Sequence, residues 1–128
     1  MDTNVLSDAL RNPDGKAARG IAGCPPDELC TSIVVASELR FGSEKKGSVK
    51  LSKRIEALLE TLEVLPLSPP ADRVYAKIRS QLEARGVPIG GNDLFIAAQA
   101  LSLGLTVVTD NDAEFRRIDG LSVENWLR

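Results

Sequence analysis

Acidic residues stand at four places where an apolar run of this chain begins or ends, and their type and spacing could support chemistry. They are Asp2 in MDTNV, Glu38 in IVVASELRFG, Asp93 in GGNDLFIAAQA, and the cluster Asp110, Asp112 and Glu114 in TVVTDNDAEF. Carboxylates avoid the edge of a hydrophobic core unless a positive charge compensates for their desolvation. Acids that converge in a fold most often obtain that charge from a divalent cation. The sequence therefore predicts Mg²⁺- or Mn²⁺-dependent phosphodiester chemistry.

Histidine is absent from the chain. Its absence excludes a Ser-His-Asp triad, a Cys-His nucleophile pair and any general acid or base built on imidazole. Cys24 and Cys30 are expected to be free thiols, because two scattered cysteines without histidine lack the partners of a zinc site. If the protein cuts phosphodiesters, carboxylates and a metal must do it.

Length and composition predict one domain over residues 1–128. A chain of 128 residues, 43% of them hydrophobic and 27% charged, is typical of a single globular protein. No apolar run approaches the roughly 20 residues that cross a bilayer. The start MDTNV has no basic region followed by an apolar one, as a secretory signal would. We therefore expect a cytoplasmic protein without a membrane partner.

Net charge gives no general attraction for nucleic acid, since 16 basic and 18 acidic residues leave −2. An RNA substrate would have to be held by local basic patches. Two are readable, one from Lys45 to Arg54 and one from Arg73 to Arg85. Both also fit the solvated faces of amphipathic helices, which is the commoner origin of such patches.

Short β-branched or Leu-rich runs alternate with longer helical patterns, which predicts an α/β domain with a parallel sheet. Glycines 42, 86 and 104 are expected to end helices, and Asn92 is expected to be an N-cap. The expected strands are residues 29–31, 64–67, 106–109 and 121–123, besides a first strand that ends at Asp2. The expected helices are residues 5–10, 16–22, 32–41, 48–62, 70–85 and 92–103.

This order of elements predicts that the acids meet at one edge of the sheet, where the carboxyl ends of parallel strands gather. Asp2 would end the first strand, Asp93 would lie in the first turn of a helix, and Glu38 about one and a half turns into another. Each acid also has an ordinary structural role open to it. Asp2 could cap the next helix, Asp93 could favour a helix N-terminus, and Glu38 could face solvent.

The motifs also resemble a known family in order and over essentially the whole chain. Asp-Thr-Asn at the start, Ser-Glu-Leu-Arg-Phe-Gly, Gly-Gly-Asn-Asp-Leu-Phe-Ile-Ala-Ala, Val-Val-Thr-Asp-Asn-Asp-Ala-Glu-Phe and a closing Val-Glu-Asn-Trp are similar to PIN-domain toxins of the VapC type. The resemblance implies a three-layer α/β/α domain with a central parallel sheet of four to five strands. It also implies a Mg²⁺- or Mn²⁺-dependent endoribonuclease, neutralised by a VapB-type antitoxin and often a homodimer within a larger complex.

By position, Asp2, Glu38 and Asp93 match the three best-defined acidic positions of that family, and the resemblance implies that they hold the metal. The fourth position could be Asp110, Asn111 or Asp112, with Glu114 matching a more distal acid; we favour Asp110 and Asp112 as catalytic because they bring charge. The family usually has several apolar residues before its first Asp, forming a central strand. Here only Met1 precedes Asp2, so we expect a shortened first strand.

Two other functions fit parts of this pattern. An aspartate phosphotransfer protein, receiver-like or phosphatase-like, also gathers acids at a strand end. However, the phosphatase motif has a second Asp where this chain has Asn4, and no Lys follows the last strands as a receiver requires. A PIN-like scaffold that binds a partner without turnover is the non-enzymatic alternative. The RNA target stays open at this point.

Overall fold

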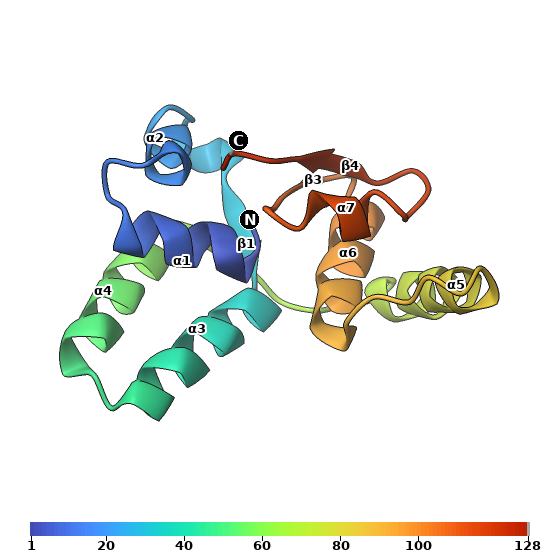
Figure 1. The fold of residues 1–128 in the computed structure, drawn as a ribbon, viewed down its shortest axis with the longest axis horizontal. Coiled ribbons are helices and arrows are strands. Elements are labelled where there is room, and N and C mark those ends of the chain that lie inside the picture. Colours follow the sequence, from blue (N-terminus) through green and yellow to red (C-terminus); the bar gives the residue numbers. More distant parts are fainter. Residues whose placement is uncertain (128) are drawn as a thin grey trace.

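The computed structural model describes residues 1–127, in which helices alternate with short strands (Figure 1). The elements are α1 (Thr3–Arg11), α2 (Lys16–Ala22), a 3-10 turn (Pro26–Glu28), β1 (Cys30–Ser32), α3 (Ile33–Lys46), α4 (Val49–Glu60), β2 (Glu63–Leu65), α5 (Ala71–Ala84), α6 (Gly91–Leu103), β3 (Thr106–Val108), α7 (Asp112–Phe115) and β4 (Ser122–Glu124). Helices α3 and α4 pack on each other on one side, and α5 packs on α6 on the other. This alternation confirms the predicted α/β class.

The strands form two two-stranded sheets, and both are parallel. Strand β1 pairs with β2, with Thr31 opposite Val64, and β3 pairs with β4, with Val107 opposite Val123. The single sheet of four to five strands that we expected is therefore divided in two within residues 1–127.

Met1 and Asp2 lie between the two sheets. The amino group of Met1 donates to the carbonyl of Cys30 in β1 over 3.1 Å, and the amide of Asp2 donates to the carbonyl of Val108 in β3 over 3.0 Å. Successive backbone donors that point to opposite sides are typical of a strand in the middle of a sheet. Met1 and Asp2 thus stand between the sheets, at the place where the first strand was expected to end.

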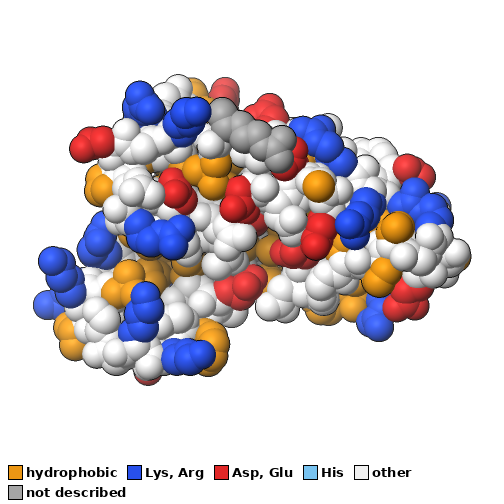
Figure 2. All heavy atoms as spheres, viewed as in Figure 1, with side chains coloured by type: hydrophobic (Ala, Val, Ile, Leu, Met, Phe, Trp, Pro, Cys, Tyr) orange, Lys and Arg blue, Asp and Glu red, His pale blue; other side chains and the backbone are white. Residues whose placement is uncertain are grey.

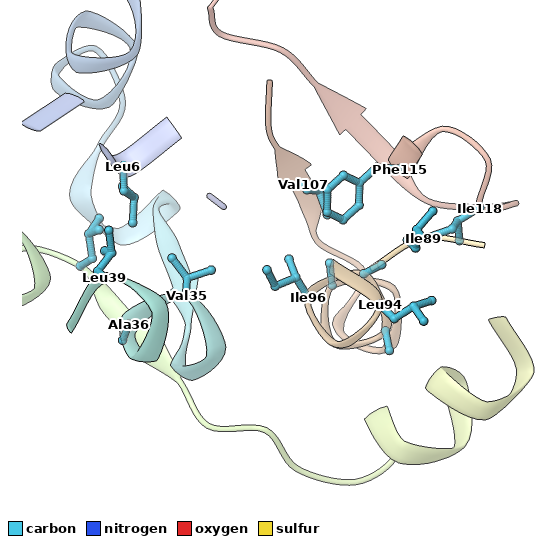
Figure 3. Close-up of a cluster of buried hydrophobic side chains, with 14 of the residues drawn as sticks. Leu6, Val35, Ala36, Leu39, Ile89, Leu94, Ile96, Val107, Phe115 and Ile118 are labelled. Carbon is cyan, nitrogen blue, oxygen red and sulfur yellow. The ribbon is translucent and has the colours of Figure 1, made fainter. Parts of the chain in front are cut away.

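Apolar side chains from both sides of this seam make up the core (Figure 3). Leu6 of α1 and Leu39 of α3 contribute on one side. Val107 of β3, Ile96 of α6 and the fully buried Phe115 of α7 contribute on the other. The core therefore fixes α1, α3, α6 and α7 relative to one another, and the acids described below lie on these helices or just before them.

Two predicted helix ends were wrong. Helix α3 runs through Gly42 to Lys46 and ends at Gly47, whose φ of 64° is left-handed and whose amide bonds the carbonyl of Glu44 over 3.1 Å. A glycine inside a helix costs only about 1 kcal/mol relative to alanine, whereas a left-handed cap needs one. Helix α6 begins at Gly91 with Gly90 as its N-cap, so Asn92 lies inside the first turn.

Other predictions for these residues held. Gly86 and Gly104 have positive φ where α5 and α6 end. Cys24 and Cys30 are free cysteines. Within residues 1–127, none of the helices combines the length and the apolar character needed to cross a membrane.

Candidate active site

Asp2 is held at the junction of the two sheets by two hydrogen bonds. Its Oδ1 accepts from the amide of Val5 over 3.1 Å and so caps α1, while its Oδ2 accepts from the hydroxyl of Thr109. The side chain is buried, with only 4% of the residue exposed. Burial raises the pKa of Asp2, and the bonds from Thr109 and Val5 oppose that rise. Capping of α1 therefore uses one oxygen of the Asp2 carboxylate, and the other oxygen lies at the junction of the two sheets.

Thr109 links this carboxylate to the turn that follows β3. It is fully buried, and its hydroxyl accepts from the amide of Asn111 over 2.9 Å while it donates to Asp2. The side-chain amide of Asn111 donates to Glu114 over 2.9 Å. Asn111 and Glu114 were open but not favoured on the sequence, and Thr109 was overlooked there. A polar residue that ends the apolar run TVV was the available signal.

Asp93 lies in the first turn of α6, and its electrostatic environment is acidic. Its pKa rises from 3.8 to about 6, first because of burial and then because of the charges of Asp2, Glu114 and Glu38. A hydrogen bond from Asn111 works in the opposite direction. Among residues 1–127, none of the influences on this pKa comes from a lysine or an arginine. The fold thus brings the three acids expected to hold metal into one field, together with Glu114.

The two acids favoured as catalytic from the last cluster lie in different surroundings. Asp110 is exposed, accepts from the side-chain amide of Asn4 over 3.1 Å, and lies near enough to Asp2 to raise its pKa. Asp112 is buried, and its carboxylate contacts Arg116 over 3.4 Å and the side-chain amide of Asn125 over 3.1 Å. Asp112 therefore joins α7 to the C-terminal segment, while Asn111 turns toward the acids.

The donors at this site suit a hard divalent cation. Within residues 1–127, no three acids lie close enough to form a ready metal cage. Mg²⁺ does not require one, because it keeps several waters and is usually bound through one or two carboxylates together with substrate phosphates. A cation would also offset both the burial of Asp93 and the repulsion from its acidic neighbours, which together raise its pKa. Acidic side chains gather in the middle of the face in Figure 2, and Lys and Arg side chains lie around them, both over the α1, α3 and α4 side and over the α5 side.

A family model described as PIN domain matches residues 1–121. The chain belongs to the PIN-domain family. It is of the VapC type, since it is 35% identical to "Ribonuclease VapC1" of Haemophilus influenzae over 100% of this chain and 97% of that protein. It is also 32% identical to "tRNA(fMet)-specific endonuclease VapC" of Shigella flexneri over 98% of this chain and 96% of that protein.

The PIN fold of this chain has a counterpart in a DNA-bound VapBC complex from Salmonella typhimurium. That structure matches with a TM-score of 0.89 and 33% identity, over 98% of this chain and 95% of the other. These findings confirm the resemblance noted in the motifs, and with it the PIN-like α/β fold.

Proposed function

We propose that this PIN-domain protein is a metal-dependent endoribonuclease, the toxin of a type II toxin–antitoxin module. The observation that supports it best is the surroundings of Asp93, where burial first, and then the charges of Asp2, Glu114 and Glu38, raise its pKa to about 6. Among the described residues, no basic side chain contributes to the pKa of Asp93, so these acids suit a site in which Mg²⁺ or Mn²⁺ supplies the positive charge. Relatives that match over nearly the whole chain are named ribonuclease or endonuclease VapC.

In this proposal, Asp2 and Asp93 are the main ligands of the cation, and Glu38 with Asp110 positions a second cation or a bound water. When bound, the metal polarises the phosphate and lowers the pKa of the attacking water. Thr109 fixes the carboxylate of Asp2 through its hydroxyl. Asp112 has a positioning role, since its contacts with Arg116 and Asn125 set the path of the turn. No side-chain nucleophile is needed, in agreement with the absence of histidine.

The proposed partner is a VapB-type antitoxin, because solved relatives are VapBC complexes. Helices α3 and α4 offer it two exposed apolar side chains, Phe41 at 66% and Val49 at 70% exposure. We propose that a segment of the antitoxin folds across these helices and directs an Arg or Lys toward the acids. Such a cation would compete with Mg²⁺. A homodimer within this complex is part of the proposal.

The decisive experiment measures cleavage of total RNA and of single-stranded oligonucleotides by the purified chain, with Mg²⁺, with Mn²⁺ and with EDTA. We expect cleavage with either metal and none with EDTA. Asp93→Asn is the control against a contaminating nuclease. Cleavage that persists in EDTA would refute metal dependence. A purified chain that binds the antitoxin but, on its own, cleaves no RNA with either metal would favour the non-catalytic scaffold.

A second experiment tests the antitoxin arrangement. Inhibition at a one-to-one ratio should weaken as Mg²⁺ rises, and should collapse when the antitoxin's inserted Arg or Lys is changed to Ala. A mutant antitoxin that still blocks cleavage fully would replace competition for the acids with steric occlusion.

A further inference from the structure

The closing Val-Glu-Asn-Trp motif, residues 123–126, runs beside the turn that follows β3. Figure 1 shows the chain leaving β4 and continuing toward α2, near which the C-terminal end lies. The backbone carbonyl of Glu124 accepts from the amide of Thr109 over 3.0 Å, so the pairing of β4 with β3 continues into the turn. The motif therefore contacts the segment that carries Asp110 and Asn111.

Asn125 uses both ends of its side-chain amide at this contact. Its Nδ2 donates to the carboxylate of Asp112 over 3.1 Å and, over a longer 3.4 Å, to the backbone carbonyl of Asp110. Its Oδ1 accepts from the amide of Leu127 over 2.8 Å, which is the bond of an Asx turn. One side chain thus bonds the first and the third residue of the turn and also fixes its own backbone.

Hydrophobic contacts anchor the chain that follows Asn125. The ring of Trp126 lies so close to Gly20 of α2 that a methyl group there would come within 2.6 Å of its Cε3. Trp126 and Leu127 also pack against a buried cluster from α1, α2 and β3, formed by Val5, Ala17 and Val108. Asn125 is therefore held between the β3–β4 pairing on one side and α2 on the other, and it can restrain the turn.

We propose that Asn125 is a positioning residue, which fixes the turn after β3 so that the side chains of this turn meet the acids of the site. The inference rests on the proposed ribonuclease function. Asp110 lies near enough to Asp2 to raise its pKa, and Asn111 makes a hydrogen bond to Asp93. The directions of both side chains depend on the backbone that Asn125 holds.

A role in stability alone is the alternative, and two variants of Asn125 separate it from positioning. Asn125→Asp keeps an oxygen for the amide of Leu127 but replaces the donor with a second acceptor, which would face the Asp112 carboxylate and the Asp110 carbonyl. Asn125→Ala removes the amide without adding a charge. The two variants share the loss of the donor to the turn.

The anchor can be disturbed at a distance from the acids. Gly20→Ala places a methyl group in the space of the Trp126 ring and should push the C-terminal segment away from α2. Gly42→Ala is its control, since Gly42 also lies inside a helix and has nothing within 4 Å of such a methyl group. Glu124→Gln is the control for Asn125→Asp, because Glu124 is exposed and a glutamine oxygen can still accept from Trp126.

The test combines kinetics with a readout that needs no turnover. Values of kcat and KM are measured across a Mn²⁺ titration, and melting temperatures show whether each variant is folded at the assay temperature. Trp126 is the single tryptophan of the chain. Quenching of its fluorescence by acrylamide, recorded in EDTA, therefore reports on the C-terminal segment alone.

We expect both Asn125 variants to lower kcat on the order of tenfold with little change in KM, because the turn is misplaced while the substrate surface is kept. The Mn²⁺ concentration that gives half-maximal activity should rise severalfold. Gly20→Ala should act in the same direction and increase the quenching of Trp126. Gly42→Ala and Glu124→Gln should match the parent in every measurement.

A parental kcat in folded Asn125 variants would overturn the proposal, and so would a loss that Glu124→Gln shows in equal measure. A loss explained wholly by a smaller folded fraction would assign Asn125 to stability alone and overturn it too. If the parent cleaves no RNA, the rise in melting temperature caused by Mn²⁺ becomes the readout. A rise that both Asn125 variants reduce would support positioning while the ribonuclease function falls, and an equal rise in all variants would overturn positioning.

Discussion

The acids of this protein fall into two regions whose neighbours differ. Asp2 and Asp93 lie where α1 and α6 begin, and their pKa values are raised by burial and by neighbouring acids. Asp112 at the start of α7 is about as buried as Asp2, but its carboxylate contacts Arg116 and Asn125. Burial alone thus does not distinguish the acids that we propose as metal ligands from the acid to which we give a positioning role. The identity of its neighbours does.

The largest expected effect separates these regions by activity. Asp93→Asn should lower RNA cleavage about 10³-fold, since a metal-held charge contributes several kcal/mol to the transition state. Glu38→Gln should act in the same direction. Both variants should melt close to the parent, which circular dichroism checks. Asp112→Asn should retain most of the cleavage of whatever fraction remains folded. Intact cleavage in Asp93→Asn, or its loss only through unfolding, would place the converging acids in structure.

The fold was predictable from the sequence because hydrophobic periodicity and chain breakers are local signals. Gly86 and Gly104 follow the ends of α5 and α6 as predicted, because the chain there adopts the left-handed backbone conformation that favours glycine. Gly42 was wrongly predicted to end α3. The choice between Gly42 and Gly47 depends on how α3 packs, and no local sequence pattern contains that information. The division of the sheet depends on contacts of Met1 and Asp2 with the two halves, which lie far apart in sequence.

The convergence of Asp2, Glu38 and Asp93 was predictable from strand-end positions, as topology brings these ends together. The roles within the TDNDAE turn were not. Asp110, Asn111 and Asp112 are adjacent in sequence, and their directions are set by bonds to Asn4, Glu114 and Arg116. Charge was the only criterion that the sequence offered there. It favoured Asp110 and Asp112, and the carboxylate of Asp112 contacts Arg116 and Asn125.

The next effect concerns the support beneath Asp2. A cavity of about 440 Å³ lies between the sheets, lined in part by Met1, Thr31 and Val107, and the ammonium of Met1 is buried, which lowers its pKa. Adding three to five apolar residues before Met1 should replace this buried charge with an amide and fill the cavity. Two buried side chains would add at least about 3 kcal/mol to the free energy of unfolding. Urea denaturation measures it.

A matched extension of serine and glycine residues is the control, because it removes the charge without filling the cavity. An apolar extension that is no more stable than this control would show that Met1 and Asp2 already complete the seam. In that case the position of Asp2 depends on Thr109 and Val5 alone.

Metal binding should sharpen the contrast between the regions. Mn²⁺ at about 100 times its dissociation constant should stabilise the native state by roughly 2.7 kcal/mol, because it binds only the folded protein. The gain should disappear in Asp93→Asn and persist in Asp112→Asn. Thermal melts with and without Mn²⁺ measure it. A melting curve that millimolar Mg²⁺ and Mn²⁺ do not move would count against the site.

The free energy of unfolding should rank the variants differently from activity: Asp112→Asn, which keeps most of its cleavage, should lose the most stability. Asp112→Asn removes the charge that pairs with Arg116 and alters the bond with Asn125, so it should cost about 2 kcal/mol of unfolding free energy. Urea denaturation of Asp112→Asn and Asp110→Asn makes the comparison, since Asp110 is exposed and close by in the same turn. Equal stability of the two variants would contradict the structural role of Asp112.

The smallest expected effect is a pH dependence of the stability that Asp93→Asn gains over the parent. The folded protein raises the pKa of Asp93 from 3.8 to about 6, so between these values the native state binds more protons than the unfolded state. The stability of the parent should therefore fall as pH rises through this window, whereas the amide side chain of the variant has no proton to release. The variant should match the parent in free energy of unfolding near pH 4. Above pH 6 it should exceed the parent by on the order of 1 kcal/mol, a value reduced for solvent screening because the side chain is partly exposed.

Melting in EDTA from pH 4 to pH 8 measures the difference, and Mn²⁺ should reverse its sign by favouring the ionised acid. A difference that stays constant across this range would mean that the neighbouring acids do not strain Asp93, and the distinction between the two acidic regions would lose its electrostatic basis.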